Sequence, residues 1–96
     1  MGLFEKITTK YRYADGAQMA VLHKYAVRFE FAGRWVDFGF EQALEPGIDR
    51  LIHADSMLNW NSLDGSEVAV SAGDKADLIS RAEEYCRAKG FTYRII

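Results

Sequence analysis

Few side chains in this sequence are of the types that catalyse reactions or hold metals. They are two histidines, one cysteine and three serines near a tryptophan: His23, His53, Cys86, Ser56, Ser62 and Ser66. His23 and His53 are 30 residues apart. Neither has a second histidine or a cysteine at ligand spacing, so a zinc site could not be completed. The sequence therefore predicts no metal ligand.

The same residues offer no activated nucleophile or base. Cys86 falls on the apolar stripe of an expected helix, and reactive thiols need an exposed, electropositive setting. His53 has no identifiable partner, and we interpret it as a surface or capping group. The serines lie outside any nucleophile elbow, and no Gly-rich phosphate loop or dinucleotide motif is present. We expect a protein without catalytic residues, cofactor or small-molecule substrate.

Composition argues against nucleic acid and membrane partners. Twelve basic and 14 acidic residues give a net charge of −2. Charge alternates with aromatic rings only in Lys10–Tyr13, which we interpret as a strand edge. No apolar run could span a bilayer, and no secretory signal is evident at the start. The single cysteine excludes an internal disulfide, so we expect a cytoplasmic location.

The charges are unevenly distributed along the chain. Residues 1–36 carry +3, residues 37–67 carry −6 and residues 68–96 carry +1. The acidic middle segment could contact a charged partner, or it could be ordinary solvated surface. Its candidate partner-binding residues are Asp37, Glu41, Glu45, Asp49 and Asp55.

Strand signals dominate the first half of the chain. We expect a first strand over about Ile7 to Tyr13, then a turn or short helical piece in "ADGAQMA". In "KYAVRFEF", alternation places Tyr25, Val27, Phe29 and Phe31 on one face. "AGR" then turns the chain into "WVDFGF", where Val36, Phe38 and Phe40 alternate with Trp35, Asp37 and Gly39. The pattern predicts a β-hairpin.

Helical signals appear in the second half. The spacing of Ile48, Leu51 and Ile52 predicts a short helix after Pro46, followed by a polar loop in "MLNWNSLDG" and a strand in "SEVAVSA". Asp74 is the expected N-cap of a long helix that ends at Gly90, with a buried stripe of Leu78, Ile79, Ala82, Tyr85 and Cys86. "FTYRII" closes the chain as a strand. We predict a single α+β domain over residues 1–96, with a mostly antiparallel sheet of about five strands and one long helix on one face.

Trp60 is the unusual residue of the polar loop. One interpretation is that its indole is buried and pins the loop onto the sheet, with the N–H bonded locally. The other is that it contacts a partner, as tryptophans at binding hot spots do. Met57, Leu58 and Leu63 could supply packing for the first interpretation.

The C-terminal half resembles a known family. "DSMLNWNSLDG", followed by a strand and then "AEEYCRAKGFTYRI", is similar to the iron-sulfur protein 4-like accessory subunits of respiratory complex I (NADH:quinone oxidoreductase). Loop positions that match are Asp55, Met57, Leu58, Trp60 and Ser62. The matching helix-strand positions are Ala82, Tyr85, Gly90, Phe91, Tyr93 and Ile95. Ser56 and Asn59 replace a proline and a glycine of the family's loop, and "GRWVDFGFEQALEPG" looks inserted.

The resemblance implies an accessory, non-catalytic protein that docks against larger subunits of an electron-transport complex. Those subunits ligate no cluster, in agreement with the single cysteine here. A second hypothesis is a free-standing inhibitor or adaptor of the kind that phages and mobile elements encode. Such a protein would use the acidic segment to cover a basic site on a larger protein.

Overall fold

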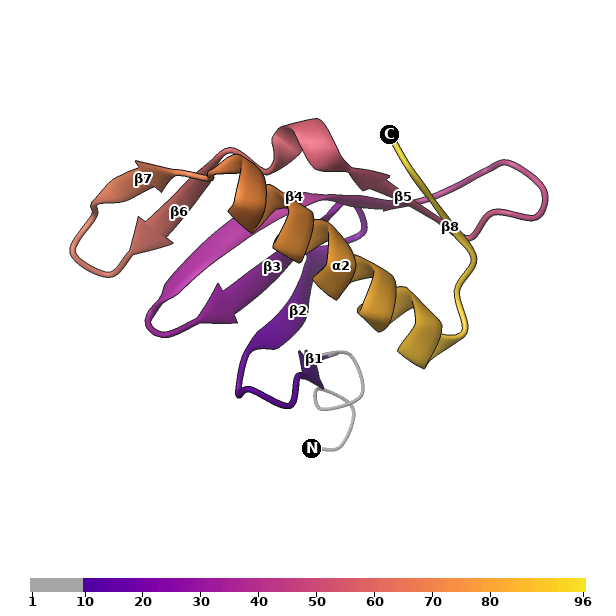
Figure 1. Ribbon diagram of the computed structural model, residues 1–96. Helices are drawn as coiled ribbons and strands as arrows, with labels where there is room; N and C mark the ends of the chain where they lie inside the picture. The colour runs from indigo at the N-terminus through magenta and orange to yellow at the C-terminus, as the bar shows by residue number, and fades with distance from the viewer. Residues whose placement is uncertain (1–9) are drawn as a thin grey trace.

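The computed structural model describes residues 10–96, which form an eight-stranded sheet with one long helix on one face (Figure 1). The strands are β1 (Lys10–Arg12), β2 (Gln18–His23), β3 (Ala26–Phe31), β4 (Arg34–Gln42), β5 (Arg50–His53), β6 (Asn59–Ser62), β7 (Glu67–Ala69) and β8 (Tyr93–Ile95). A 3-10 turn, η1 (Ala54–Ser56), follows β5, and α2 (Ala72–Lys89) precedes β8.

Most strand pairs are antiparallel neighbours in sequence. The order is β1-β2-β3-β4-β5-β8. Beyond the end of β5, β6 pairs with the first residues of β4, and β7 pairs with β6. Only β8 is parallel to its partner, because the chain returns to β5 through α2. The α+β class and the mostly antiparallel sheet are confirmed, but the sheet has eight strands and not about five.

The β3–β4 hairpin follows directly from its sequence. Ala32 and Gly33 join the two strands, and both have positive φ angles, 54° and 79°. Two left-handed residues give a turn whose twist matches that of the paired strands. The resulting register sets Phe29 opposite Val36 and Val27 opposite Phe38. The predicted hairpin is confirmed.

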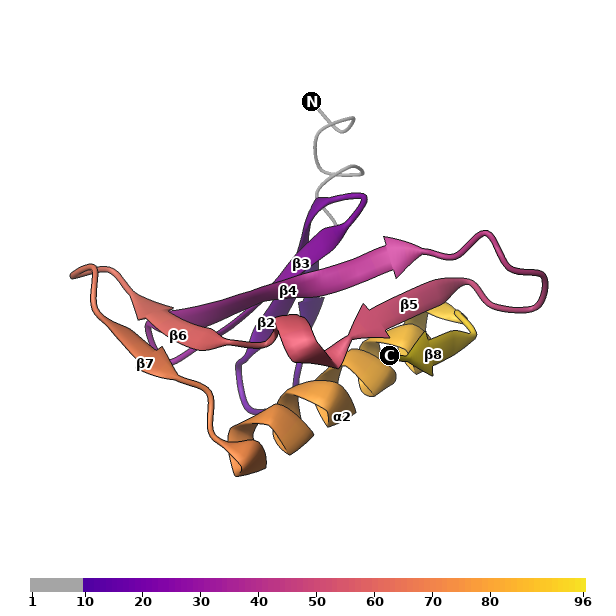
Figure 2. The same cartoon turned by 90° about the horizontal axis from the view of Figure 1, so that it is seen from above.

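One face of the sheet forms the core together with α2. Alternation along β4 turns Val36, Phe38 and Phe40 toward the helix, and all three are buried. Figure 2 shows α2 running along this one face. Its buried side chains are Leu78, Ala82, Tyr85 and Cys86, whereas Ile79 is only partly buried.

Capping residues define both ends of α2. The Ser71 side chain accepts a hydrogen bond from the Asp74 backbone N–H at 3.1 Å, so Ser71 is the N-cap and the expected cap at Asp74 is wrong. Asp74 instead contributes a negative charge to the first turn. Gly90 ends the helix in the left-handed conformation, as predicted.

Two other expectations are wrong. The segment after Pro46 forms β5 and η1, not a helix, because Arg50–His53 pair with both β4 and β8. The polar stretch around Trp60 forms β6 and not a loop. Of the two alternatives for "ADGAQMA", the turn is confirmed: residues 14–16 form a turn that leads into β2. The expected first strand is described only from Lys10, because Ile7 to Thr9 lie outside the described residues.

Candidate functional site

The face of the sheet opposite α2 carries a cluster of charged and aromatic side chains. Along β4, Trp35, Asp37, Gly39 and Glu41 alternate with the buried core residues and so point away from the helix. Strand pairing places Arg28 of β3 beside Asp37, and His53 of β5 beside Gly39. We call the surface formed by Arg28, Trp35, Asp37, Gly39, Glu41 and His53 the open face.

An ion pair stacked on a tryptophan forms one half of the open face. Arg28 donates from Nε to Asp37 Oδ1 at 2.7 Å and from Nη2 to Asp37 Oδ2 at 2.9 Å. Its guanidinium carbon lies 5.0 Å from the centroid of the Trp35 ring. The hydrogen bond to Asp37 raises the pKa of Arg28. Two parallel bonds and a cation–π contact hold the guanidinium in one orientation.

A histidine packed on a glycine forms the other half. A Cβ at position 39 would lie 2.9 Å from the Cβ of His53, so only glycine leaves room for this ring. From there His53 Nε2 reaches Glu41 Oε1 at 2.5 Å. The His53 and Glu41 side chains are about one-third exposed, like those of the first pair. The partner of His53 that the sequence did not reveal is therefore Glu41.

The Ser56 hydroxyl lies close to His53 but serves the backbone. It accepts from the Gly39 N–H at 2.7 Å and donates to the His53 carbonyl oxygen at 2.7 Å. Both bonds tie η1 to the sheet. A serine nucleophile needs its hydroxyl bonded to a base, and the Ser56 proton is instead given to a carbonyl. The arrangement serves to position His53.

The remaining acidic candidates lie elsewhere, and each has a partner. Glu45 makes a two-pronged ion pair with Arg94, at 3.0 and 2.7 Å. Asp49 accepts from the Thr92 backbone N–H at 2.9 Å. Asp55, almost fully exposed, lies 3.6 Å from Lys75. Asp37 and Glu41 are thus the two of the five candidates that the fold brings onto one face.

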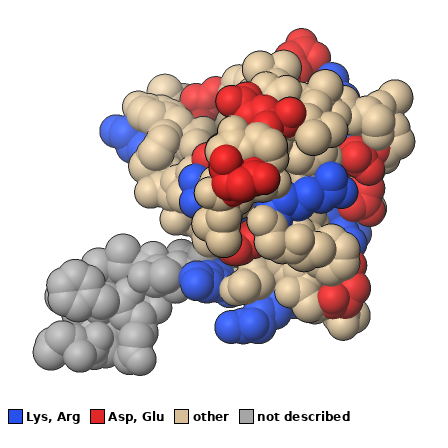
Figure 3. Space-filling model, turned by 90° about the vertical axis from the view of Figure 1, so that its left-hand side faces the viewer, with Lys and Arg blue, Asp and Glu red and all other residues tan. Residues whose placement is uncertain are grey.

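Acidic and basic side chains are also intermingled on the side of the molecule that carries the ends of the β3–β4 and β6–β7 hairpins (Figure 3). No extended patch of one sign is visible there. The acidity of residues 37–67 along the chain therefore does not produce a large negative surface on this side.

Trp60 lies on the α2 side of the sheet and is 5% exposed. Its ring meets Phe29 edge to face at 6.3 Å between centroids, and the Arg34 guanidinium covers it at 4.0 Å. The indole N–H donates to Asp74 Oδ2 at 3.0 Å. These contacts agree with the first interpretation, in which the indole is buried. The acceptor of its N–H is Asp74 in the first turn of α2.

Trp35, unlike Trp60, is partly exposed and could contact a partner. It was not singled out in the sequence analysis. Its side chain is half-buried beside Arg28, and Asn61 of β6 bonds its carbonyl oxygen at 3.4 Å. The alternation of β4 could have predicted this exposure, because Trp35 falls on the face opposite Val36, Phe38 and Phe40. Tryptophan and arginine are the residues most enriched at binding hot spots.

The Cys86 thiol is poorly placed to react. Cys86 is fully buried, and burial raises the pKa of its thiol to about 11. Within residues 10–96, no group of three or more histidine, cysteine or acidic side chains could hold a metal ion. No helix of the described part is long and apolar enough to cross a membrane.

Comparisons of the chain with protein families, with curated proteins and with solved structures find no match. Functional inference therefore depends on the geometry of the chain itself.

Proposed function

We propose that this chain is a small non-catalytic protein-binding domain that docks on a larger protein through its open face. In this proposal it acts as an accessory or assembly subunit of a respiratory complex I-type enzyme in the cytoplasmic compartment. The docking surface is the one defined above, centred on Trp35 and the Arg28–Asp37 ion pair beside it. The proposal needs neither a cofactor nor a reacting group on this chain.

The observation that carries the proposal is the stacking of Arg28 on Trp35 beside Asp37. The group is about one-third exposed and held in place before any partner arrives. Side chains that are already ordered lose little entropy on binding, so more of the contact energy appears as affinity. A tryptophan and an arginine in one ordered cluster are suited to the centre of an interface.

The pairing of the acidic residues favours this proposal over the inhibitor alternative. An inhibitor that covers a basic site needs carboxylates free to meet the partner's cations. Asp37, Glu41 and Glu45 are already bonded to Arg28, His53 and Arg94. Opening any of these pairs would offset part of the energy gained from the partner.

Affinity purification from the native host with the unmodified chain and two variants tests the proposal. Trp35→Ala should remove the retained partner while the domain stays folded, with a loss of about 2 kcal/mol or more in affinity. Tyr25→Ala is the matched control, because Tyr25 is an aromatic residue 55% exposed outside the open face. It should bind like the unmodified chain. Retention of the same partner by Trp35→Ala would contradict docking through the open face.

The identity of the retained protein separates the two functional classes. Subunits of a respiratory enzyme would support the accessory role. An isolated host enzyme or a nucleic-acid-binding protein, held through a basic site, would instead support the inhibitor. In that second case the affinity should fall steeply with salt, since exposed charges are screened over about 8–10 Å.

A further inference from the structure

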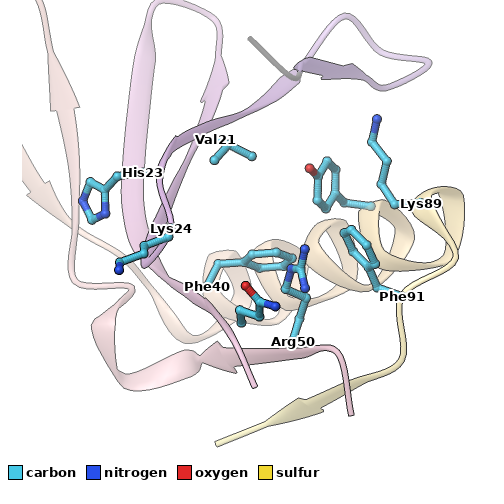
Figure 4. Close-up of a pocket in the computed structure, with 9 residues that line it drawn as sticks. Val21, His23, Lys24, Phe40, Arg50, Lys89 and Phe91 are labelled. Carbon is cyan, nitrogen blue, oxygen red and sulfur yellow. The ribbon is translucent and has the colours of Figure 1, made fainter. Parts of the chain in front are cut away.

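A cavity of about 260 Å³ lies on the α2 side of the sheet, away from the open face. It is bounded by the end of β2, by β4 and β5, and by the C-terminal end of α2 with the residues that follow (Figure 4). Three aromatic rings line it: Phe40, Tyr85 and Phe91. Phe40 and Tyr85 meet edge to face at 5.5 Å, which fixes their orientation.

Basic side chains surround this aromatic lining. Lys24, Arg50 and Lys89 contribute cations, and His23 lies at one end. None of the described residues that line the cavity is acidic. Figure 4 shows Arg50 between Phe40 and Phe91, with Lys89 beyond Phe91 and with His23 and Lys24 at the opposite end. The electrostatic potential within the cavity therefore favours an anion.

Arg50 is held in position to receive that anion. Its guanidinium carbon lies 3.9 Å from the centroid of the Phe91 ring, and Nη1 donates to the Asp49 carbonyl oxygen at 2.8 Å. That bond occupies one of the five N–H groups of a guanidinium. The planar fork suits two parallel hydrogen bonds to a carboxylate or phosphate.

The end of α2 does not cancel this preference. A helix C-terminus presents carbonyl oxygens that repel anions. Here the carbonyl oxygen of Cys86 accepts from the Phe91 N–H at 2.8 Å, and that of Arg87 accepts from the Gly90 N–H at 3.2 Å. Lys89 adds a positive charge in the same turn.

We propose that this cavity binds a small aromatic anion, a single ring that carries a carboxylate or a phosphate. The ring would pack against Phe40, Tyr85 and Phe91, and the anionic group would meet Arg50 and Lys89. The volume lies just below the usual range of about 300–1,000 Å³ for ligand pockets, which limits the ligand to about one ring. This inference is independent of the proposed docking function, because the cavity and the open face lie on opposite sides of the sheet.

Titration of the full chain with simple probes, followed by amide NMR shifts, tests the inference without any protein partner. The probes are benzoate, phenyl phosphate, neutral benzamide and inorganic phosphate. Saturable shifts centred on Phe40, Arg50 and Phe91 are expected with benzoate or phenyl phosphate, and the stronger of the two identifies the anionic group. Benzamide and inorganic phosphate should each bind at least about tenfold more weakly, because benzamide lacks the negative charge and inorganic phosphate lacks the aromatic ring.

Two pairs of variants locate the anion. Arg50→Gln and Lys89→Gln should each weaken the better probe, Arg50→Gln by about tenfold or more. Arg94→Gln and Arg87→Gln are the controls: Arg94 lies on the neighbouring strand β8 and Arg87 in the same last turn of α2, and neither lines the cavity. Lys89 is exposed, so its variant remains informative even if Arg50→Gln unfolds. Equal binding of benzamide and benzoate, equal loss in the control variants, or shifts scattered over the surface would overturn the inference.

Discussion

The indole N–H of Trp60 donates to Asp74 Oδ2 at 3.0 Å and thereby joins β6 to the first turn of α2. This bond explains why a polar stretch contains an indole. Alternation along β6 turns Trp60 inward, while Asn59 and Asn61 point to the opposite face. The ring fills the core, and its one polar atom meets the carboxylate at the positive end of the helix.

Shortening the Trp60 side chain should destabilise the fold strongly. We expect Trp60→Ala to lower the free energy of unfolding by about 3–5 kcal/mol through the cavity that it leaves. Trp60→Phe should cost less, because it keeps most of the packing and loses the bond to Asp74. Urea unfolding of both variants measures the difference. A stable Trp60→Ala variant that loses only partner binding would instead support the contact interpretation.

Leu78 rather than Ile79 should be the most sensitive position on α2. Leu78 is fully buried, whereas Ile79 packs only partly against the core. Leu78→Ala should cost about 2–5 kcal/mol and Ile79→Ala clearly less. Both variants remove aliphatic carbons from the same helix, so the difference between their unfolding free energies reports the difference in burial of the two side chains. Equal costs would show that the helix is rotated relative to the structure.

The hairpin and the long helix could be predicted because their signals are local. The period of two in Val36, Phe38 and Phe40 and the Ala32-Gly33 turn need no knowledge of the rest of the chain. The turn also sets Arg28 opposite Asp37, so that ion pair could have been derived from the sequence. The same alternation that places Phe38 in the core places Trp35 on the opposite face, so its exposure could have been predicted too.

Elements that depend on distant strands could not be predicted in the same way. The spacing of Ile48, Leu51 and Ile52 fits a helix, but β5 exists because it lies between β4 and β8. Its partners in β8 lie more than 40 residues further along the chain. The His53–Glu41 contact depends on the pairing of β5 with β4. Glu41 could therefore not be identified from the sequence as the partner of His53. Alternation also misled at Tyr25. It grouped Tyr25 on one face with Val27 and Phe29, yet Tyr25 lies just before β3 and is 55% exposed, whereas the other two are buried.

Acid should destabilise the contact between α2 and the β1–β2 turn. Arg81 donates two hydrogen bonds to Asp15, at 3.0 and 2.5 Å, and holds the pKa of that carboxyl at about 2, below its ordinary value of 3.8. The folded state therefore binds fewer protons than the unfolded state between about pH 4 and pH 2. The stabilisation is complete above this window and is lost as the pH falls through it.

Asp15→Asn isolates this effect. The variant should be less stable than the unmodified chain near neutral pH, and the difference should shrink as the pH approaches 2. Urea midpoints measured over this pH range give the comparison. A constant difference at every pH would mean that the negative charge of Asp15 does not carry the effect and that the substitution disturbs the turn in another way.

Gly39→Ala should disturb the open face by displacing His53. The added Cβ would lie 2.9 Å from two carbon atoms of the His53 side chain, so that side chain must shift away from Glu41. Overpacking of this kind costs about 1–3 kcal/mol. The double variant Gly39→Ala with His53→Gly removes every atom of this contact, including the His53 Cβ, and its cost should be smaller than the sum of the single costs. Strict additivity in unfolding free energies would argue against the contact.

Exchanging the charges of Arg28 and Asp37 should separate folding from docking. Either single reversal, Arg28→Asp or Asp37→Arg, sets like charges side by side on neighbouring strands. Each should lower the unfolding free energy by about 1 kcal/mol or less, because the side chains are 38% exposed and partly screened. The double exchange restores an ion pair and should recover most of that stability, but it moves the cation away from its stacked position over Trp35.

Thermal melting measures the change in stability, and titration against the retained partner measures the change in affinity. A double variant that regains stability but not affinity would support docking through this pair. One that regains both would mean that the pair serves only to hold β3 and β4 together.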